Sequence, residues 1–162
     1  MNAIAAVDEC WGIGRNGKLL ARLPGDLGYF KDKTLGKTIV IGRETFDSMS
    51  GNLLHGRETV ILTKNMDFKQ NCPVFHTLEE TLGYLQGKHT EDIFVSGGEK
   101  VYRQFFPYCD TFFITKLYAA FGADRFFPNL DERRGEFTVK PVSSVLEENS
   151  VRYQFFEYTR KK

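Results

Sequence analysis

Short apolar segments recur along the whole chain and constrain its fold more than any other feature of the sequence. They are rich in β-branched and aromatic residues, which favours strands over helices at this length. The segments are Ala3–Val7, Thr38–Ile41, Thr59–Leu62, Val74–His76, Ile93–Val95, Thr111–Leu117, Phe137–Val142 and Val151–Tyr158. We predict that each of them forms a β-strand.

Helical patterns occupy several of the segments between these strands: Pro24–Thr34, Glu44–Met49, Leu78–Gln86 and Glu99–Phe106. Strands and helices alternate through the first two-thirds of the chain, which favours parallel βαβ units. In the last third, strands are joined by loops, and the polar segment Leu146–Ser150 suits a hairpin turn. The sequence therefore predicts an α/β protein with a mixed sheet and helices on both faces.

The size and charge of the chain exclude some classes of function. Its 162 residues fit one domain, and 41% hydrophobic with 27% charged residues is ordinary for a globular protein. The formal net charge is +1. We therefore expect neither a nucleic acid nor a membrane as a partner, because both attract strongly basic proteins.

The cysteines and the N-terminus indicate a cytoplasmic protein. Cys10, Cys72 and Cys109 match no metal or redox spacing, so we expect reduced thiols and no metal site. The segment Met1–Val7 lacks a basic region, and Asp8 interrupts its apolar run. We interpret it as a buried strand, not as a signal peptide or a membrane span.

Small residues and cations follow three of the predicted strands, where ligands bind in parallel sheets. Gly42–Arg43 follows the second strand, Thr63–Lys64 the third, and Ser96–Glu99 the fifth. Glycine lets a ligand approach the backbone, and cations suit phosphate. Each piece alone fits an ordinary turn equally well. Together they predict a dinucleotide site, in which Arg43 and Lys64 favour NADPH over NADH.

The segment Gly12–Gly17 matches the G-x-G-x-x-G pattern but is not a typical dinucleotide-binding turn. Such a turn opens directly into a helix. Here only Lys18–Leu23 precedes Pro24, which is too short for a crossover helix, and no acidic residue ends the next strand. We predict instead a glycine-rich loop that can move over a site.

Asp26 is the candidate catalytic acid. On a helix, Leu23, Leu27 and Phe30 form one apolar stripe, and Asp26 lies at its edge. A carboxylate on an apolar face is costly unless it is hydrogen-bonded or its pKa moves, a condition that acid catalysis uses. An exposed aspartate in the first turn of a helix explains this segment equally well.

A set of motifs in one fixed order covers nearly the whole chain. It comprises Ile4–Val7, Trp11–Gly14, Leu23–Leu27 with Phe30, Ile41–Phe46, Gly56–Arg57, Val60–Thr63, Val95–Tyr102, Thr115 and Ala123–Pro128. This ordered set resembles the dihydrofolate reductase family. The resemblance implies a single domain over residues 1–162 with a dihydrofolate-reductase-like fold. That fold has a mixed, mostly parallel sheet of about eight strands, about four flanking helices and an antiparallel C-terminal hairpin.

The resemblance also implies an enzyme that reduces 7,8-dihydrofolate to 5,6,7,8-tetrahydrofolate with NADPH and supplies one-carbon metabolism. Such an oxidoreductase acts on a CH–NH bond, with hydride passing to C6 and a proton to N5. It further implies a monomeric, cytoplasmic protein that antifolates inhibit.

For the substrate, the resemblance assigns Asp26 to the pteridine N3 and 2-amino group, where it favours protonation of N5. It assigns Arg57 to the α-carboxylate of the glutamate tail, which suits the bidentate guanidinium. The full set implied for substrate binding is Ile4, Ala5, Asp26, Leu27, Phe30, Met49, Leu54, Arg57 and Thr115.

For the cofactor, the resemblance assigns residues to the nicotinamide, to the phosphates and to the adenosine 2′-phosphate, with Thr63 and Lys64 at the last. It also implies a cis peptide bond between Gly97 and Gly98. The full set is Ala6, Ile13, Gly14, Leu19, Gly42, Arg43, Glu44, Thr45, Leu62, Thr63, Lys64, Ser96, Gly97, Gly98, Glu99, Lys100, Val101 and Tyr102.

Two stretches depart from the family pattern. Leu19–Arg22 lacks the usual Leu-Pro-Trp, whose indole helps to hold a water near the pterin. Asn52–His55 carries one extra residue, which leaves the choice between Leu53 and Leu54 open. Two alternatives also stay open: another NADPH-dependent pterin or pyrimidine reductase of the same fold, against which Arg57 argues, and a non-catalytic nucleotide-binding domain.

Overall fold

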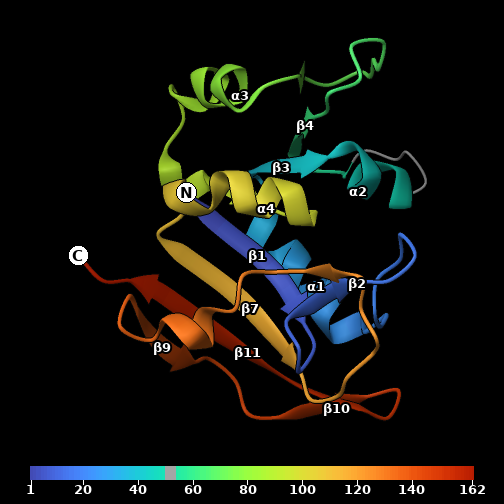
Figure 1. Ribbon diagram of the computed structural model, residues 1–162, viewed down its shortest axis with the longest axis vertical. Helices are drawn as coiled ribbons and strands as arrows, with labels where there is room; N and C mark the ends of the chain where they lie inside the picture. The colour runs from blue at the N-terminus through green and yellow to red at the C-terminus, as the bar shows by residue number, and fades with distance from the viewer. Residues whose placement is uncertain (50–53) are drawn as a thin grey trace.

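A central sheet organises the protein (Figure 1). The computed structural model describes residues 1–49 and 54–162. Within those ranges the sheet has nine strands, with the spatial order β10-β11-β7-β1-β6-β3-β4-β5 and with β9 also paired to β11. The strands are β1 (Asn2–Val7), β3 (Thr38–Gly42), β4 (Glu58–Leu62), β5 (Val74–Phe75), β6 (Ile93–Val95), β7 (Thr111–Leu117), β9 (Phe137–Pro141), β10 (Leu146–Glu148) and β11 (Val151–Arg160).

The sheet is mixed, as predicted. The strands from β7 through β1, β6, β3 and β4 to β5 pair in parallel, whereas β11 runs antiparallel to β7, β9 and β10. A second, two-stranded sheet joins β2 (Gly12–Gly14) to β8 (Arg125–Phe126). The carboxyl ends of β1, β3, β4 and β6 therefore share one edge, where the sequence places the site.

Helices cover both faces of the sheet. The helices are α1 (Pro24–Thr34), α2 (Arg43–Ser48), α3 (Leu78–Leu85) and α4 (Glu99–Phe105), with short 3₁₀ turns η1 (Thr90–Asp92), η2 (Phe106–Tyr108) and η3 (Leu130–Arg133). Right-handed crossovers put α1 and α2 on one face and α3 and α4 on the other. Figure 1 shows α4 in front of the sheet and α1 behind it.

The central strands have continuous apolar sequences because both of their faces are buried. In β3, Ile39 and Ile41 pack with Phe46 of α2, whereas Val40, pointing to the opposite face, packs in the cluster that contains α4. This alternation explains why these strands carry no polar face.

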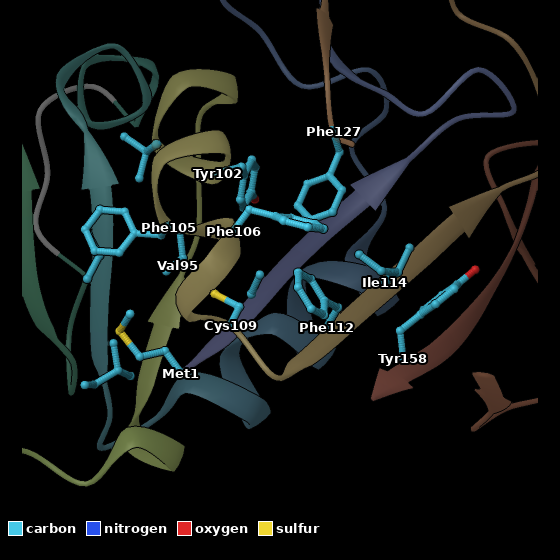
Figure 2. Close-up of a cluster of buried hydrophobic side chains, with 14 of the residues drawn as sticks. Met1, Val95, Tyr102, Phe105, Phe106, Cys109, Phe112, Ile114, Phe127 and Tyr158 are labelled. Atoms are coloured by element: carbon cyan, nitrogen blue, oxygen red, sulfur yellow. The ribbon is translucent and has the colours of Figure 1, made fainter. Parts of the chain in front are cut away.

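Aromatic residues fill the larger core cluster (Figure 2). Phe112 of β7 is fully buried, and its ring centroid lies 5.3 Å from that of Phe106, 5.4 Å from that of Phe137 and 6.2 Å from that of Phe127. These contacts join η2, β9 and the segment after β8 to the centre of the sheet.

The predicted strands and helices all occur, with ends that differ by a few residues. The prediction missed β2, β8 and β10, which have only two or three residues each and therefore too few for a periodic pattern. Leu146–Glu148, predicted as part of a turn, pairs with β11, and the turn is confined to Asn149–Ser150, where both φ angles are positive. No helix within residues 1–49 and 54–162 is long and apolar enough to cross a membrane.

Phe112→Ala should lower the free energy of unfolding by about 3–5 kcal/mol, because it leaves a large cavity in a fully buried cluster. Urea denaturation followed by circular dichroism measures this loss. The control is Val145→Ala at an exposed position, where a change within roughly 0.5 kcal/mol is expected. Equal effects of the two substitutions would contradict this description of the core.

Candidate active site

Asp26 and Thr115 meet between α1 and the sheet. Asp26 lies in the first turn of α1, which begins at Pro24, a residue suited to this position. Thr115 is buried in β7, between β1 and β11. Its hydroxyl Oγ1 donates a hydrogen bond of 2.7 Å to Asp26 Oδ1. Two residues that were predicted separately thus form one polar contact in apolar surroundings.

The surroundings raise the pKa of Asp26 above its ordinary value. Burial is the largest cause, because it penalises the charged carboxylate. The hydrogen bond from Thr115 acts in the opposite direction, and the negative charge of Glu148 raises the pKa further. The Asp26 carboxyl therefore keeps its proton to a higher pH than an aspartate exposed to water.

Phenol groups surround this acid. Burial is the main cause that raises the pKa of Tyr29 to about 12 and that of Tyr153 to about 12, and the charge of Asp26 contributes to both. The Tyr29 ring stacks on Phe155 with centroids 3.9 Å apart, and its hydroxyl is buried without a hydrogen-bond partner in the described part of the chain. At neutral pH these phenols are uncharged.

An apolar wall lies beside the acid on the same face of the sheet. Phe30, Met49 and Leu54, all predicted to contact the substrate, pack against the cluster of Ile39, Ile41, Phe46 and Ile61. Leu53, the alternative to Leu54, lies outside the described residues. Of the other predicted residues, Ile4 is buried in β1, and Ala5 and Leu27 are partly buried.

Arg57 is held at the far end of this wall. Its Nε donates to the carbonyl oxygen of His55 at 3.0 Å, and its Nη1 lies 3.5 Å from Thr34 Oγ1. Arg57 also lines a hollow of about 340 Å³ at the amino ends of β3 and β4. The guanidinium is therefore anchored in one orientation, a geometry that suits a bidentate contact with a carboxylate.

The carboxyl ends of β3 and β6 come together around three glycines. Gly42 N–H donates to the Gly97 carbonyl oxygen at 2.8 Å, and the Gly97–Gly98 peptide bond is cis, as the resemblance implied. A Cβ on Gly97 or Gly98 would lie 3.3 Å from Thr45 Oγ1, and one on Gly42 would lie 3.1 Å from Val101. Five of the residues predicted for the cofactor are thus brought together at one edge of the sheet.

Cations flank this edge. Arg43, Lys64 and Lys100 are exposed, and Arg43 Nε lies 3.5 Å from Asp47 Oδ2. Glu44 is also exposed, and Leu62 is buried at the end of β4. These cations lie at the surface, where a phosphate can reach them from solvent.

His76 was not among the predicted site residues, although it lies beside one of them. Its Nδ1 is 2.8 Å from the carbonyl oxygen of Thr63, because β5 and β4 are parallel neighbours. Its position at the end of a predicted strand was the available signal.

The predicted mobile loop is docked on the segment that precedes β8. Asp124 Oδ2 accepts from Asn16 N–H at 2.9 Å, and Asp124 N–H donates to the Gly14 carbonyl oxygen at 2.9 Å. Ile13 and Gly14 are partly buried in β2, whereas Leu19 is 61% exposed and lines a hollow of about 380 Å³. Asp26 lines neither this hollow nor the one beside Arg57.

The remaining cofactor candidates tie the two sheets together. Tyr102 donates from its hydroxyl to the Ile4 carbonyl oxygen at 2.6 Å, beside Ala6 of the same strand. Glu99 Oε1 accepts from Phe126 N–H at 2.9 Å, so this carboxylate holds β8. Ser96 N–H donates to the Val40 carbonyl oxygen at 2.9 Å. Among the residues with described positions, no group of three or more His, Cys, Asp or Glu is placed to hold a metal.

Asp8 is a structural residue of this edge that the sequence analysis missed. It is buried directly after β1, and its Oδ1 accepts from Cys10 N–H at 2.9 Å and from Gly12 N–H at 2.8 Å. Its Oδ2 accepts from Phe121 N–H at 3.1 Å. One carboxyl thus fixes both loops that border the site, and an acid at the end of a buried strand was the signal for it.

Comparisons with known proteins agree with one another. A family model described as dihydrofolate reductase matches residues 1–160. The dihydrofolate reductase of Bacillus subtilis is 36% identical over 159 residues, which cover 98% of this chain and 93% of that protein. The dihydrofolate reductase of Staphylococcus haemolyticus is 32% identical, with 99% of this chain and 95% of that protein covered.

A solved structure of dihydrofolate reductase from Enterococcus faecalis complexed with NADP(H) and RAB-propyl has the same fold. It superimposes with a TM-score of 0.85 at 35% identity and covers 99% of this chain and 96% of that chain.

Asp8→Ala should destabilise the protein by about 1–3 kcal/mol, because several backbone N–H groups lose their acceptor. Hydrogen exchange at Gly12 and Phe121 should accelerate together. Glu9→Ala, which removes an exposed carboxyl next along the chain, should leave both rates unchanged. Acceleration at only one of the two loops would show that Asp8 does not couple them.

Proposed function

Since this chain belongs to the dihydrofolate reductase family and reduces 7,8-dihydrofolate to 5,6,7,8-tetrahydrofolate with NADPH, we propose that Asp26 is the acid of the reaction. The observation that carries this proposal is the hydrogen bond from Thr115 to Asp26, made inside a largely apolar site. It gives the chain one orientated carboxyl with a raised pKa beside the substrate wall.

Asp26 acts by binding the pteridine and favouring its protonation. Thr115 occupies Oδ1, which leaves Oδ2 to accept from the pteridine N3 and 2-amino group. Burial keeps the carboxyl protonated closer to neutral pH, as acid catalysis requires. A proton would then reach N5 directly or through water.

The edge formed by β3, β4 and β6 fits the cofactor. Gly97 and Gly98 carry no side chain, and a Cβ on either would lie 3.3 Å from Thr45 Oγ1, so the backbone at this turn stays narrow enough for a ligand to approach. Arg43 would contact the phosphates, and Thr63 with Lys64 the adenosine 2′-phosphate. NADPH supplies the hydride when it is bound. Ala6, Ile13, Gly14, Ser96 and Tyr102 would hold the nicotinamide at the pterin and exclude water from it.

Arg57 binds the tail of the substrate in this proposal. Its guanidinium is held by the His55 carbonyl oxygen and by Thr34 at the end of α1, and it would receive the α-carboxylate of the glutamate there. We also propose that residues 1–162 act as one domain and as a cytoplasmic monomer, without nucleic-acid or membrane partners, and that antifolates inhibit it. The central nine-stranded sheet, to which elements from both ends of the described chain belong, supports the single domain. The net charge of +1 supports the absence of nucleic-acid and membrane partners.

The direct test is the consumption of NADPH on addition of dihydrofolate, followed by absorbance, with an antifolate as the control. Oxidation that the antifolate abolishes supports the assignment. NADPH binding without oxidation would support a non-catalytic nucleotide-binding protein instead.

Asp26→Asn should lower kcat by about 10²–10⁴-fold near neutral pH, which is the range for loss of one general acid. The amide is isosteric and still accepts from Thr115, so the melting temperature and the Kd for NADPH should stay close to wild type. Asp32→Asn, a carboxyl farther along the same helix, is the control. Full turnover by Asp26→Asn would remove Asp26 from the mechanism.

Arg57→Ala should raise KM for dihydrofolate about 10–100-fold with a small change in kcat, because a charge-assisted contact distant from the reacting atoms is lost. A dihydrofolate analogue without the glutamate should be insensitive to the substitution. A loss confined to kcat would contradict the tail assignment, and equal KM values for the two substrates in wild type would favour another pterin reductase.

A further inference from the structure

Glu148 reaches from the C-terminal hairpin to the helix that carries Asp26. Its Oε1 accepts from Gly25 N–H at 2.7 Å, across 123 positions of sequence. Gly25 immediately precedes Asp26 in the first turn of α1. The hydroxyl of Tyr153, a buried residue of β11, donates to the same oxygen.

This contact replaces an ordinary helix cap. The first N–H groups of a helix need acceptors, which a Ser, Thr, Asp or Asn side chain just before the helix often supplies. In α1 that position holds Leu23, whose side chain makes no such bond. Glu148 therefore supplies the acceptor from another strand, and its negative charge suits the positive end of the helix dipole.

The residue at position 25 must be small for the contact to form. A Cβ on Gly25 would overlap both the Tyr153 hydroxyl and the Glu148 carboxylate. The same hairpin also holds the chain before α1, because Asn149 Nδ2 donates to the Arg22 carbonyl oxygen at 3.3 Å. Two neighbouring residues of one hairpin thus clamp the start of the helix on both sides of Leu23.

Glu148 of β10 is also a charged neighbour of Asp26, and its negative charge raises the pKa of that carboxyl. Thr115 of β7 is hydrogen-bonded to Asp26. The phenols on which the charge of Asp26 acts are Tyr29 in α1, Tyr102 in α4 and Tyr153 in β11. Burial raises the pKa of each phenol, so none of the three is charged at neutral pH. Glu157 of β11 acts on Tyr29.

We propose that Glu148 is a positioning residue for Asp26, which holds the first turn of α1 and so aims the acid at Thr115 and the pteridine. The proposal rests on the catalytic role of Asp26 given above. Glu148 touches neither substrate nor cofactor and acts through the backbone of Gly25 and through its charge. The segment Leu20–Arg22 lacks the family's usual tryptophan. The contacts of Glu148 and Asn149 hold the backbone between this segment and Asp26.

The test compares Glu148→Gln with Glu148→Ala. The glutamine keeps an oxygen for Gly25 N–H and loses the charge, whereas the alanine loses both. Glu147→Gln is the matched control, because it removes an exposed carboxyl of the same strand that lies opposite Arg152. The readouts are kcat and KM for dihydrofolate from pH 5 to 9, together with hydrogen exchange at Gly25.

Glu148→Gln should keep KM within about twofold of wild type, while its turnover falls off at a lower pH, because a charge that opposes ionisation of Asp26 is gone. Glu148→Ala should in addition raise KM about tenfold, because the first turn of α1 no longer holds Asp26 in position for the pteridine, and should accelerate exchange at Gly25. Glu147→Gln should match wild type in every readout.

The proposal is overturned if Glu148→Gln has the pH profile of Glu147→Gln and Glu148→Ala keeps the wild-type KM. If Glu148→Ala proves too unstable to assay, the pH profile of Glu148→Gln still decides the question. Asp26→Asn in the same assay separates the two claims. If turnover of Asp26→Asn depends on pH as in wild type, the acid role of Asp26 is rejected. If that pH dependence is lost, Asp26 is the acid, and the Glu148 variants alone decide whether Glu148 positions it.

Discussion

The hydrogen bond between Thr115 and Asp26 joins the first turn of α1 to the centre of the sheet, and most of the site is arranged around it. A carboxyl can be placed there only if it is hydrogen-bonded or protonated, because the site is largely buried and the nearby charge of Glu148 is also negative. Burial that raises its pKa and a threonine that lowers it act against each other. Their balance decides the pH range in which the acid can serve the reaction.

The rest of the fold brings ligands to that acid. Parallel strands with both faces buried end at one edge, and the glycines at this edge let backbone groups of β3 and β6 approach within hydrogen-bond distance. The loop after β1 lies over the same edge because Asp8 and Asp124 fix it to the segment before β8. Acid, wall and cofactor edge therefore depend on a few long-range polar contacts between well-packed elements.

The sequence predicted what local patterns encode. The continuous apolar runs such as Thr38–Ile41 identified the strands, and the glycine and cation that follow them are the basis of the proposed cofactor edge. Helical spacing made Asp26 a candidate, but only the ordered family motifs distinguished it from an exposed aspartate. The contacts of Asp8 with Phe121 and of Glu148 with Gly25 span more than 100 positions, so no local pattern contains them. The short strands β2, β8 and β10 form because partners far along the chain pair with them.

The buried site keeps Asp26 protonated to a higher pH than an ordinary aspartate. The most direct measurement is a ¹³C NMR titration of the Asp26 carboxyl carbon in the folded protein, with the resonance assigned by its absence in a variant that lacks this carboxyl. We expect a midpoint above the ordinary aspartate value of 3.8. A midpoint at or below that value would contradict it, because the carboxyl would then be ionised throughout the range in which an acid is needed.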